Sequence, residues 1–361
     1  MTGGGFGDMP DDPSDLTVHR ATELFLESKS VDVTEKTVKD YRDRLRWFVN
    51  WCEENGIKTV GDLSGMAIDR ARAARANEGV APTTLKGMMV AINQLVDYLV
   101  GIGAVDEQLV ESVDIPSLDT AEETSDTLLD EQTATNLLEF YRDSPGDYAD
   151  AHHTFLELSW NTGARMGGLL ALDLQDYDVI NDDGAVSGGV LRFRHRPESE
   201  TPLKNKTKGE RVVRISKEVA EVLQYYIARD RSDKRDDHGR EPLLCGHQGR
   251  PSESTLRAWS YLATQPCAYM ACPHGEQRET CQFRKRNHAS KCPSSRSPHQ
   301  IRSGSITWQL NRGIPLEHVA ERVNASPEVI ARFYDKAADE RKMRRREQYT
   351  EDLDINTEDE S

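Results

Sequence analysis

The sequence has no long apolar run: none of its segments approaches the roughly 18 apolar residues that a membrane-spanning helix requires. Residues 1–16 hold neither a basic stretch nor an apolar one, so a secretory signal is not expected. Apolar residues make up 37% of the 361-residue chain, a modest fraction that still permits packed cores. We therefore expect a cytoplasmic protein of two or three domains that does not contact a membrane.

Bases are also scarce, with 46 Lys and Arg against 62 Asp and Glu, which gives a net charge of −16. Four acids fall in residues 1–16 and six in residues 350–361, with no base in either, so both segments are expected to be disordered acidic tails. The bases that are present gather in islands at 203–217, 267–302 and 341–346. Such islands suit phosphate binding, although a single one is more often a solvated surface. An acidic chain with basic islands fits a DNA-binding protein from a high-salt cytoplasm, such as that of a halophilic archaeon.

Residues 17–116 carry a helical pattern almost throughout. Thr34 is placed to cap a helix whose apolar residues recur at steps of three and four, until Gly56 ends it. Thr83 is placed to cap a second long helix that stops at Gly101. Shorter apolar segments before and between these two helices complete a bundle of four or five helices, which we expect to form the first domain.

A polar stretch at 117–127 lacks any apolar period and predicts an exposed linker. The second domain is expected at 128–349. One of its helices is predicted to run on across residues 162–179. Two β-rich runs at 190–195 and 211–216, joined by a lysine-rich loop, predict a small antiparallel sheet.

Helical patterns dominate the rest of the second domain. Asp130 is placed to cap its first helix, and helical segments resume at 218–228, around Leu256 and from 298 to 349. A cysteine-rich insertion occupies about 264–297. The expected fold class is therefore mainly α with a small antiparallel β-sheet.

Three short segments of the second domain resemble the signature positions of one family. They are N-T-G-A-R-M-G-G-L-L-A-L at 161–172, H-Q-I-R at 299–302 and V-N-A-S-P-E-V-I-A-R-F-Y-D at 323–335. Between the first two, K-T-K-G-E-R-V-V at 206–213 resembles a β-hairpin that delivers a lysine. In this order, and behind a helical bundle, they are similar to the tyrosine recombinase (phage integrase) family. The resemblance covers about residues 17–349 and implies a helical core-binding domain followed by an α+β catalytic domain.

The resemblance implies five catalytic residues: Arg165, Lys206, His299, Arg302 and Tyr334. Two arginines can offer planar forks to the nonbridging oxygens of a pentacoordinate phosphorane, which removes the need for a metal ion. Tyr334 would be the nucleophile, and His299 would accept or relay its proton. Lys206 best fits the place of the general acid, with Lys208 the alternative, although a plain phosphate contact suits a hairpin lysine nearly as well. No cofactor is implied for catalysis.

The function implied is site-specific recombination or integration through a 3′-phosphotyrosyl intermediate. The expected partner is double-stranded DNA, bound by a homotetramer. Four residues near the signature segments are expected to contact the DNA: Lys204, Lys208, Arg211 and Asn324. Phosphate contacts of this kind fix the position of a protein on a duplex.

One position departs from the family pattern. Ala325 stands where the family commonly has a histidine, nine residues before its tyrosine. Alanine cannot bond a phosphate oxygen, so Asn324 or a basic residue must substitute, or turnover is reduced. Loss of one of several transition-state donors typically costs about 10²–10³ in rate, so inactivity does not follow. Two alternatives stay open: a catalytically silent or weak accessory protein of the same fold, and a zinc-stabilised DNA-binding module without strand transfer.

Four of the six cysteines fall within 26 residues: Cys267, Cys272, Cys281 and Cys292. In a reducing cytoplasm, such a cluster indicates a metal site rather than disulfides. The spacing lacks the usual C-x2-C pair, so reduced cysteines without a metal are the alternative. We expect a structural zinc ion, with His274 or His288 as spare ligands.

Overall fold

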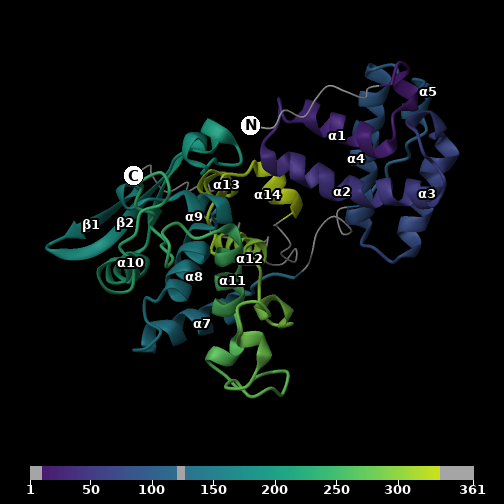
Figure 1. Ribbon diagram of the computed structural model, residues 1–361. Coiled ribbons are helices and arrows are strands. Elements are labelled where there is room, and N and C mark those ends of the chain that lie inside the picture. Colours follow the sequence, from purple (N-terminus) through teal and green to yellow (C-terminus); the bar gives the residue numbers. More distant parts are fainter. Residues whose placement is uncertain (1–9, 120–126, 334–361) are drawn as a thin grey trace, which may run out of the picture. The chain divides into compact units, whose positions relative to one another are not determined.

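The structure is a computed structural model that describes residues 10–119 and 127–333 (Figure 1). The chain divides into two compact units, residues 1–125 and residues 126–361. Within the described ranges, no helix is both long enough and apolar enough to cross a membrane.

The first unit is helical. Its described part contains α1 (Val18–Lys29), α2 (Glu35–Glu54), α3 (Gly65–Asn77), α4 (Pro82–Gly101) and α5 (Gln108–Glu111). Their apolar stripes meet in one core, in which Phe25, Phe48 and Ile92 are fully buried. The predicted helical nature of this region is confirmed.

Of the two N-cap residues predicted for the first unit, the one for α2 is correct and the one for α4 is wrong. The Thr34 hydroxyl accepts a hydrogen bond from the backbone N–H of Thr37, as expected of the cap of α2. The cap of α4 is Ala81 rather than Thr83. Pro82 occupies the first helical position, where its fixed φ and missing N–H cost nothing, so the helix begins before the threonine.

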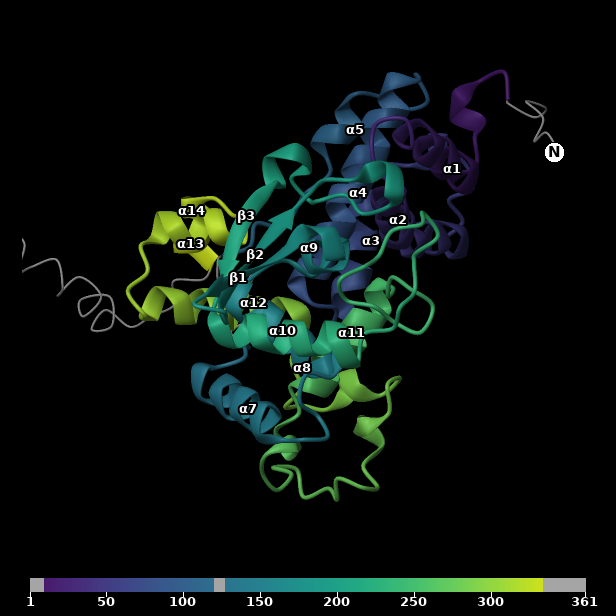
Figure 2. The same ribbon diagram turned by 90° about the vertical axis from the view of Figure 1, so that its left-hand side faces the viewer.

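The second unit combines helices with one small sheet (Figures 1 and 2). Its described helices are α7 (Glu131–Asp143), α8 (Ala151–Thr162), α9 (Met166–Ala171), α10 (Lys217–Arg229), α11 (Glu253–Ala263), α12 (Pro298–Asn311), α13 (Leu316–Val323) and α14 (Pro327–Phe333). The sheet has three antiparallel strands in the order β1 (Tyr177–Asp182), β2 (Ala185–Phe193) and β3 (Arg211–Ile215). The predicted fold class, mainly α with a small antiparallel sheet, is confirmed.

The prediction of one helix across residues 162–179 is wrong. Gly163 ends α8 in the left-handed conformation, with φ of 59°. The short α9 follows, and the chain then enters β1, which pairs with β2 across a two-residue turn at Asp183 and Gly184. Both turn residues have positive φ, 48° and 79°. An Asp-Gly turn of this kind is a strong hairpin signal, and here it outweighs the helical period of the residues before it.

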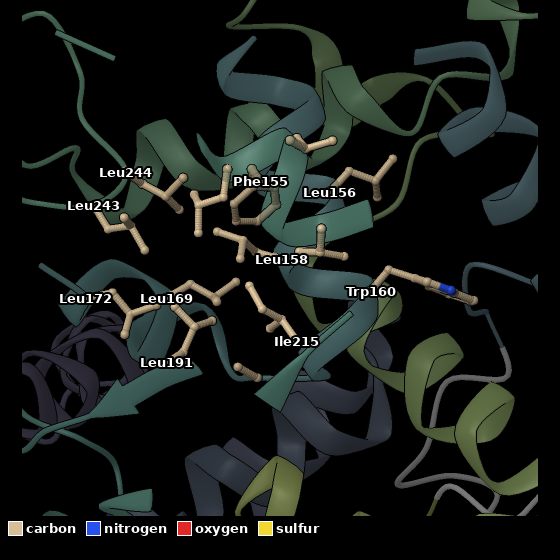
Figure 3. Close-up of a cluster of buried hydrophobic side chains, with 14 of the residues drawn as sticks. Phe155, Leu156, Leu158, Trp160, Leu169, Leu172, Leu191, Ile215, Leu243 and Leu244 are labelled. Atoms are coloured by element: carbon tan, nitrogen blue, oxygen red, sulfur yellow. The ribbon is translucent and has the colours of Figure 1, made fainter. Parts of the chain in front are cut away.

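Helix α8 lies at the centre of the second unit and packs against α7, α10, α11 and α12. Its Phe155, Leu156 and Leu158 are fully buried and meet Leu191 of β2 and Ile215 of β3 (Figure 3). Because neighbouring helices and strands cover the side chains on all sides of α8, the helix is buried and holds the segments at its two ends in position.

The helical pattern predicted from residue 298 onward is divided by two left-handed residues. Gly313, with φ of 80°, separates α12 from α13, and Asn324, with φ of 55°, separates α13 from α14. The part of that prediction beyond Phe333 lies outside the described residues. A small apolar cluster that includes Ile306, Val323 and Ile330 holds the three helices together.

Candidate active site

The T-G-A-R part of the first signature segment makes a sharp turn between α8 and α9. Gly163 adopts a left-handed conformation that disfavours side chains, and a Cβ there would lie 2.9 Å from Cγ1 of Val323. The Thr162 hydroxyl accepts the backbone N–H of Ala164 at 3.2 Å. Arg165 follows as the N-cap of α9. The small residues of the segment therefore let the chain reverse tightly and present Arg165 at a helix start.

The H-Q-I-R segment forms the first turn of α12. Ser297 and Gln300 form a capping box, and Pro298 takes the first helical position. His299 and Arg302 are three residues apart and so share one face of the helix. Arg302 is only 2% exposed, so its charge is removed from bulk water.

Three arginines from three different elements converge on the C-terminal end of α13. Arg302 donates from Nη1 to the carbonyl oxygen of Val323 at 2.8 Å and to that of Gly163 at 2.6 Å. Arg165 donates from Nη1 to the carbonyl oxygen of Asn324 at 2.6 Å. Arg211, at the start of β3, donates from Nε to the carbonyl oxygen of Arg322 at 2.8 Å. Three consecutive carbonyls at the negative end of a helix thus orient three guanidinium groups.

The arginines raise the positive potential of this region. Burial, followed by the charges of Arg302, Arg165 and Arg322, lowers the pKa of Arg211 to about 9. Its guanidinium also lies 3.9 Å from the ring centroid of Phe193. A bound anion would relieve the repulsion among these like charges, so the cluster is suited to hold a phosphate.

His299 belongs to the same electrostatic environment. Desolvation by the surrounding protein, and then the charges of Arg302, Arg165 and Lys204, lower its pKa from the ordinary 6.5. The imidazole is therefore neutral at pH 7 and able to accept a proton. The structure places His299, Arg165 and Arg302 close enough for both arginine charges to act on the imidazole, while the catalytic roles of the three residues stay a prediction.

The predicted loop lysines lie between β2 and β3. Lys204, Lys206 and Lys208 are all exposed. Lys206 opens a short 3-10 turn, η5 (Lys206–Gly209), and has a left-handed backbone with φ of 52°. Of the three, only Lys204 is among the charges that lower the pKa of His299.

The other two predicted DNA contacts have structural partners. Arg211 bonds to backbone carbonyls and packs on Phe193, so it is not an exposed phosphate contact in this structure. Asn324 ends α13 in the left-handed conformation that asparagine tolerates better than most residues. Its side-chain Oδ1 accepts a hydrogen bond from Nδ2 of Asn205 at 3.1 Å, which links the lysine loop to α13.

Ala325 is partly buried against the apolar cluster of α12 and α13. Its backbone N–H donates to the carbonyl oxygen of Ala320 at 3.0 Å, so the tight turn after α13 forms without the histidine that the family commonly has. Tyr334 lies outside the described residues. It is the next residue after α14, which Ile330 anchors in the cluster.

Arg322 lies beside the site and is not part of any of the signature segments. It donates to the backbone carbonyls of Asn161 and Arg214, and to Oδ1 of Asn161. It thereby ties the last turn of α13 to the end of α8 and to β3. A basic residue in the last turn of a helix, directly before Val323 and Asn324, was the available signal.

The structure does not support the predicted zinc site. Cys267, Cys272, Cys281 and Cys292 lie in separate short turns of the insertion, and all four are partly exposed. The ring of His274 bonds to the hydroxyl of Ser294 at 2.9 Å. In residues 10–119 and 127–333, no three His, Cys, Asp or Glu side chains are grouped so that they could hold a metal ion. A C-x2-C pair would place two thiols in one turn, but no two of these cysteines have that spacing, so each lies in a turn of its own.

Comparison with known proteins gives relatives of one kind. The tyrosine recombinase XerC of Chromohalobacter salexigens is 28% identical over 165 residues, which cover 45% of this chain and 53% of that protein. The XerC of Herpetosiphon aurantiacus is 22% identical over 324 residues, 89% of this chain and 92% of that protein. The match thus spans about half the length of the first relative and most of the second.

Solved structures share the fold. A lambda integrase tetramer bound to a Holliday junction is 13% identical with a TM-score of 0.57, covering 86% of this chain and 75% of that chain. The Tn1549 transposon integrase in complex with transposon right end DNA is 16% identical with a TM-score of 0.59, covering 91% and 99%. Residues 24–102 match the N-terminal SAM-like domain of phage integrases, and residues 127–341 match the phage integrase family. Since that second match alone spans more than half of the sequence, the chain belongs to the phage integrase family.

Proposed function

We propose that this protein is a site-specific recombinase that cleaves and rejoins double-stranded DNA by transesterification at a tyrosine. The observation that carries the proposal is the seating of Arg165 and Arg302 on adjacent carbonyls, those of Asn324 and Val323, in the same electrostatic environment as His299. Two fixed guanidinium groups can neutralise the charge that develops on a phosphorane. Family membership supports the same chemistry.

In the proposed reaction, the Tyr334 oxygen attacks the scissile phosphorus while its proton passes to neutral His299. The bond between phosphorus and the 5′ oxygen breaks, and Lys206 donates a proton to that leaving oxygen. Lys208 is the alternative donor. The products are a 3′-phosphotyrosyl link and a 5′-hydroxyl, which in turn attacks the phosphotyrosyl link of a partner duplex. The phosphoester bond energy is retained, so the cycle needs neither ATP nor a redox cofactor. Charge neutralisation, for which other phosphoryl-transfer enzymes use a metal ion, falls to the two guanidinium groups.

DNA is the proposed partner. Lys204 and Lys208 of the β2–β3 loop are exposed, which supports the proposal that they contact the phosphate backbone. Arg211 and Asn324 would act less directly, because both are engaged with the end of α13 and the loop beside it. We also propose a homotetramer on the DNA, by analogy with the lambda integrase tetramer.

The test is covalent trapping. The full chain would select its duplex from a randomised library. A nick just beyond the cleavage position would let the short fragment that carries the new 5′-hydroxyl diffuse away, so the reaction could not be reversed. We expect an SDS-resistant protein–DNA adduct that Tyr334→Phe abolishes while DNA affinity is kept. Specific binding without any adduct in the natural sequence would favour a silent accessory protein instead. An adduct that persists in Tyr334→Phe would overturn the choice of nucleophile.

A further inference from the structure

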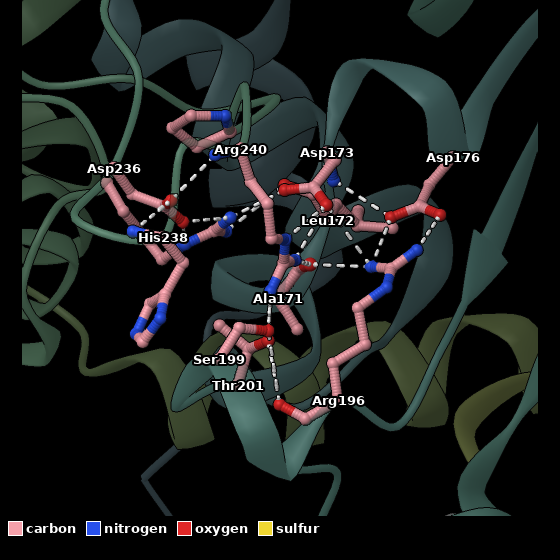
Figure 4. Close-up of polar contacts among 12 residues, drawn as sticks. Ala171, Leu172, Asp173, Asp176, Arg196, Ser199, Thr201, Asp236, His238 and Arg240 are labelled. Carbon is pink, nitrogen blue, oxygen red and sulfur yellow. Dashed lines mark hydrogen bonds and ion pairs between the residues drawn. The ribbon is translucent and has the colours of Figure 1, made fainter.

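Six charged residues surround the C-terminal end of α9, and we call them the Asp173 cluster: Asp173, Asp176, Arg196, Asp236, Arg240 and Arg250 (Figure 4). The Asp173 side chain is 2% exposed and accepts from Arg240 and Arg250 at 2.6 and 2.5 Å. Arg196 binds Asp176 through two hydrogen bonds, of 2.8 and 2.6 Å. The three positive and three negative charges balance.

The same arginines also bind the backbone at the end of α9. Arg250 donates from Nη1 to the carbonyl oxygen of Leu170 at 2.5 Å, and Arg240 donates from Nη2 to that of Ala171 at 3.2 Å. These carbonyls belong to the last turn of the helix, which has no intrahelical donors for them. The guanidinium groups supply those donors and place positive charge at the negative end of the helix.

Helix α9 depends on such support. It is six residues long and contains Gly167 and Gly168, and both its length and its glycines make it unstable by itself. Gly168 packs closely against β2, because a Cβ there would lie 3.3 Å from the ring of Phe193 and would require that ring to shift slightly. The residue that caps the start of this weak helix is Arg165. The position of Arg165 therefore depends on the contacts that fix the C-terminal end of α9, which are those of Arg240 and Arg250.

We propose that the Asp173 cluster is a positioning device for Arg165, with Arg250 and Arg240 as positioning residues that act through α9. Both arginines come from the segment between α10 and α11, which has no helix or strand of its own. Asp236 holds Arg250 by accepting from its Nε at 2.9 Å, and Thr201 holds Arg240 by accepting from its Nη1 at 2.8 Å. Because the cluster is neutral and mostly buried, it orients Arg165 without adding to the attraction for DNA.

The kinetic test of this proposal rests on the proposed function, because it measures DNA cleavage. It compares Arg250→Lys with Arg235→Lys. Arg235 lies in the same segment, and its side chain bonds to Gly239 and Glu241 rather than to a residue of α9, so it is a matched control. Arg250→Lys keeps the charge but loses the fork that reaches both Asp173 and Leu170. Since a misplacement of about 1 Å can cost about 10²-fold in rate, we expect single-turnover cleavage to fall about 10- to 100-fold. DNA affinity should stay within about threefold.

A double-mutant cycle distinguishes positioning from general destabilisation. If Arg250 acts through Arg165, then Arg250→Lys has almost no further effect on the residual cleavage of Arg165→Ala. Equal fold-losses in both backgrounds would overturn the proposal. Asp236→Asn, which acts on α9 through Arg250 and through the backbone N–H of Arg240, replaces Arg250→Lys if that variant does not fold, and the same cycle applies to it.

Hydrogen exchange of the full chain gives a readout that does not need cleavage. We expect amides of residues 163–172 to exchange faster in Arg250→Lys than in Arg235→Lys, with the rest of the second unit unchanged. Local loss of protection in a protein that never forms an adduct would uphold the positioning role and reject the recombinase chemistry. Unchanged protection and unchanged cleavage in an active protein would reject the positioning role alone.

Discussion

Arg165 donates a hydrogen bond from Nη1 to the backbone carbonyl of Asn324, 159 residues later in the sequence, at 2.6 Å. The carbonyl one residue earlier, that of Val323, accepts from Arg302. The end of α13 therefore orients both signature arginines before any DNA is present. Groups that are oriented in advance lose little free energy to reorganisation when charge develops on the substrate.

Replacing Arg165 should affect cleavage far more than binding. We expect Arg165→Ala to lower single-turnover cleavage by about 10²–10³-fold, because one donor to the phosphorane is lost. Arg165→Lys should recover little of this rate. The planar guanidinium can donate to the Asn324 carbonyl and to a phosphate oxygen from one rigid group, and an ammonium cannot. The measurement is adduct formation on a nicked duplex with a parallel titration of affinity. Cleavage within about threefold of the natural protein would contradict the assigned role.

The lowered pKa of His299 predicts a pH profile for cleavage. The neutral imidazole is the proton acceptor, so the rate should rise as pH rises through the lowered pKa and be level above the ordinary value of 6.5. Lys204→Ala removes one of the positive charges that lower this pKa, so the rising part of the profile should move to higher pH. His299→Gln should lose that part of the profile. A profile that does not respond to Lys204→Ala would show that the lysine does not act on His299.

The same shift affects folding stability, and its sign can be stated. His299 binds a proton more readily in the unfolded chain than in the folded one, because its folded pKa is the lower of the two. Its contribution to the free energy of unfolding is therefore complete above pH 6.5 and falls as pH decreases toward the folded pKa. Denaturant titrations of the natural protein and of His299→Gln should diverge in that range and run parallel above it.

Asn324 should be replaceable by glycine but not by alanine. The left-handed backbone at φ of 55° costs a residue with a Cβ about 1–2 kcal/mol, less for asparagine and nothing for glycine. We expect Asn324→Ala to lower the free energy of unfolding by about 1 kcal/mol and to slow cleavage, because the carbonyl that holds Arg165 moves. Asn324→Gly should keep the backbone and lose only the bond to Asn205. Equal stability of the two variants in denaturant titrations would contradict this account.

Ala325→His tests the departure from the family pattern. A histidine here can donate to a phosphate oxygen, and we expect adduct formation to become faster by about tenfold, less than the full value of an optimised donor. The Ala325 side chain lies against an apolar cluster, so the melting temperature should fall by a few degrees. A slower variant with unchanged affinity would mean that the site works without this donor, with Asn324 or a nearby base in its place.

Much of this protein follows from local sequence. The helical first unit, the lysine loop between two strands, and the order of the signature segments were predicted from periodicity, capping residues and motifs. The spacing of His299 and Arg302 on one helix turn is a local property, because residues three apart share a face. The segment around Gly163 likewise encodes its own reversal, since the left-handed conformation there favours glycine.

Other features depended on contacts between distant segments. The predicted helix across residues 162–179 disregards the local signal at Gly163, and the strand β1 that follows α9 depends on its pairing with β2, which outweighs a helical period. The cysteines lie close in sequence, yet their turns are not grouped as a metal site in the described residues. Above all, the bonds from Arg165, Arg211 and Arg302 to three consecutive carbonyls join four segments of the chain. The sequence determined which residues carry the charge, while tertiary structure decided where each guanidinium points, because its partners are backbone atoms that any residue provides and that only folding brings within reach.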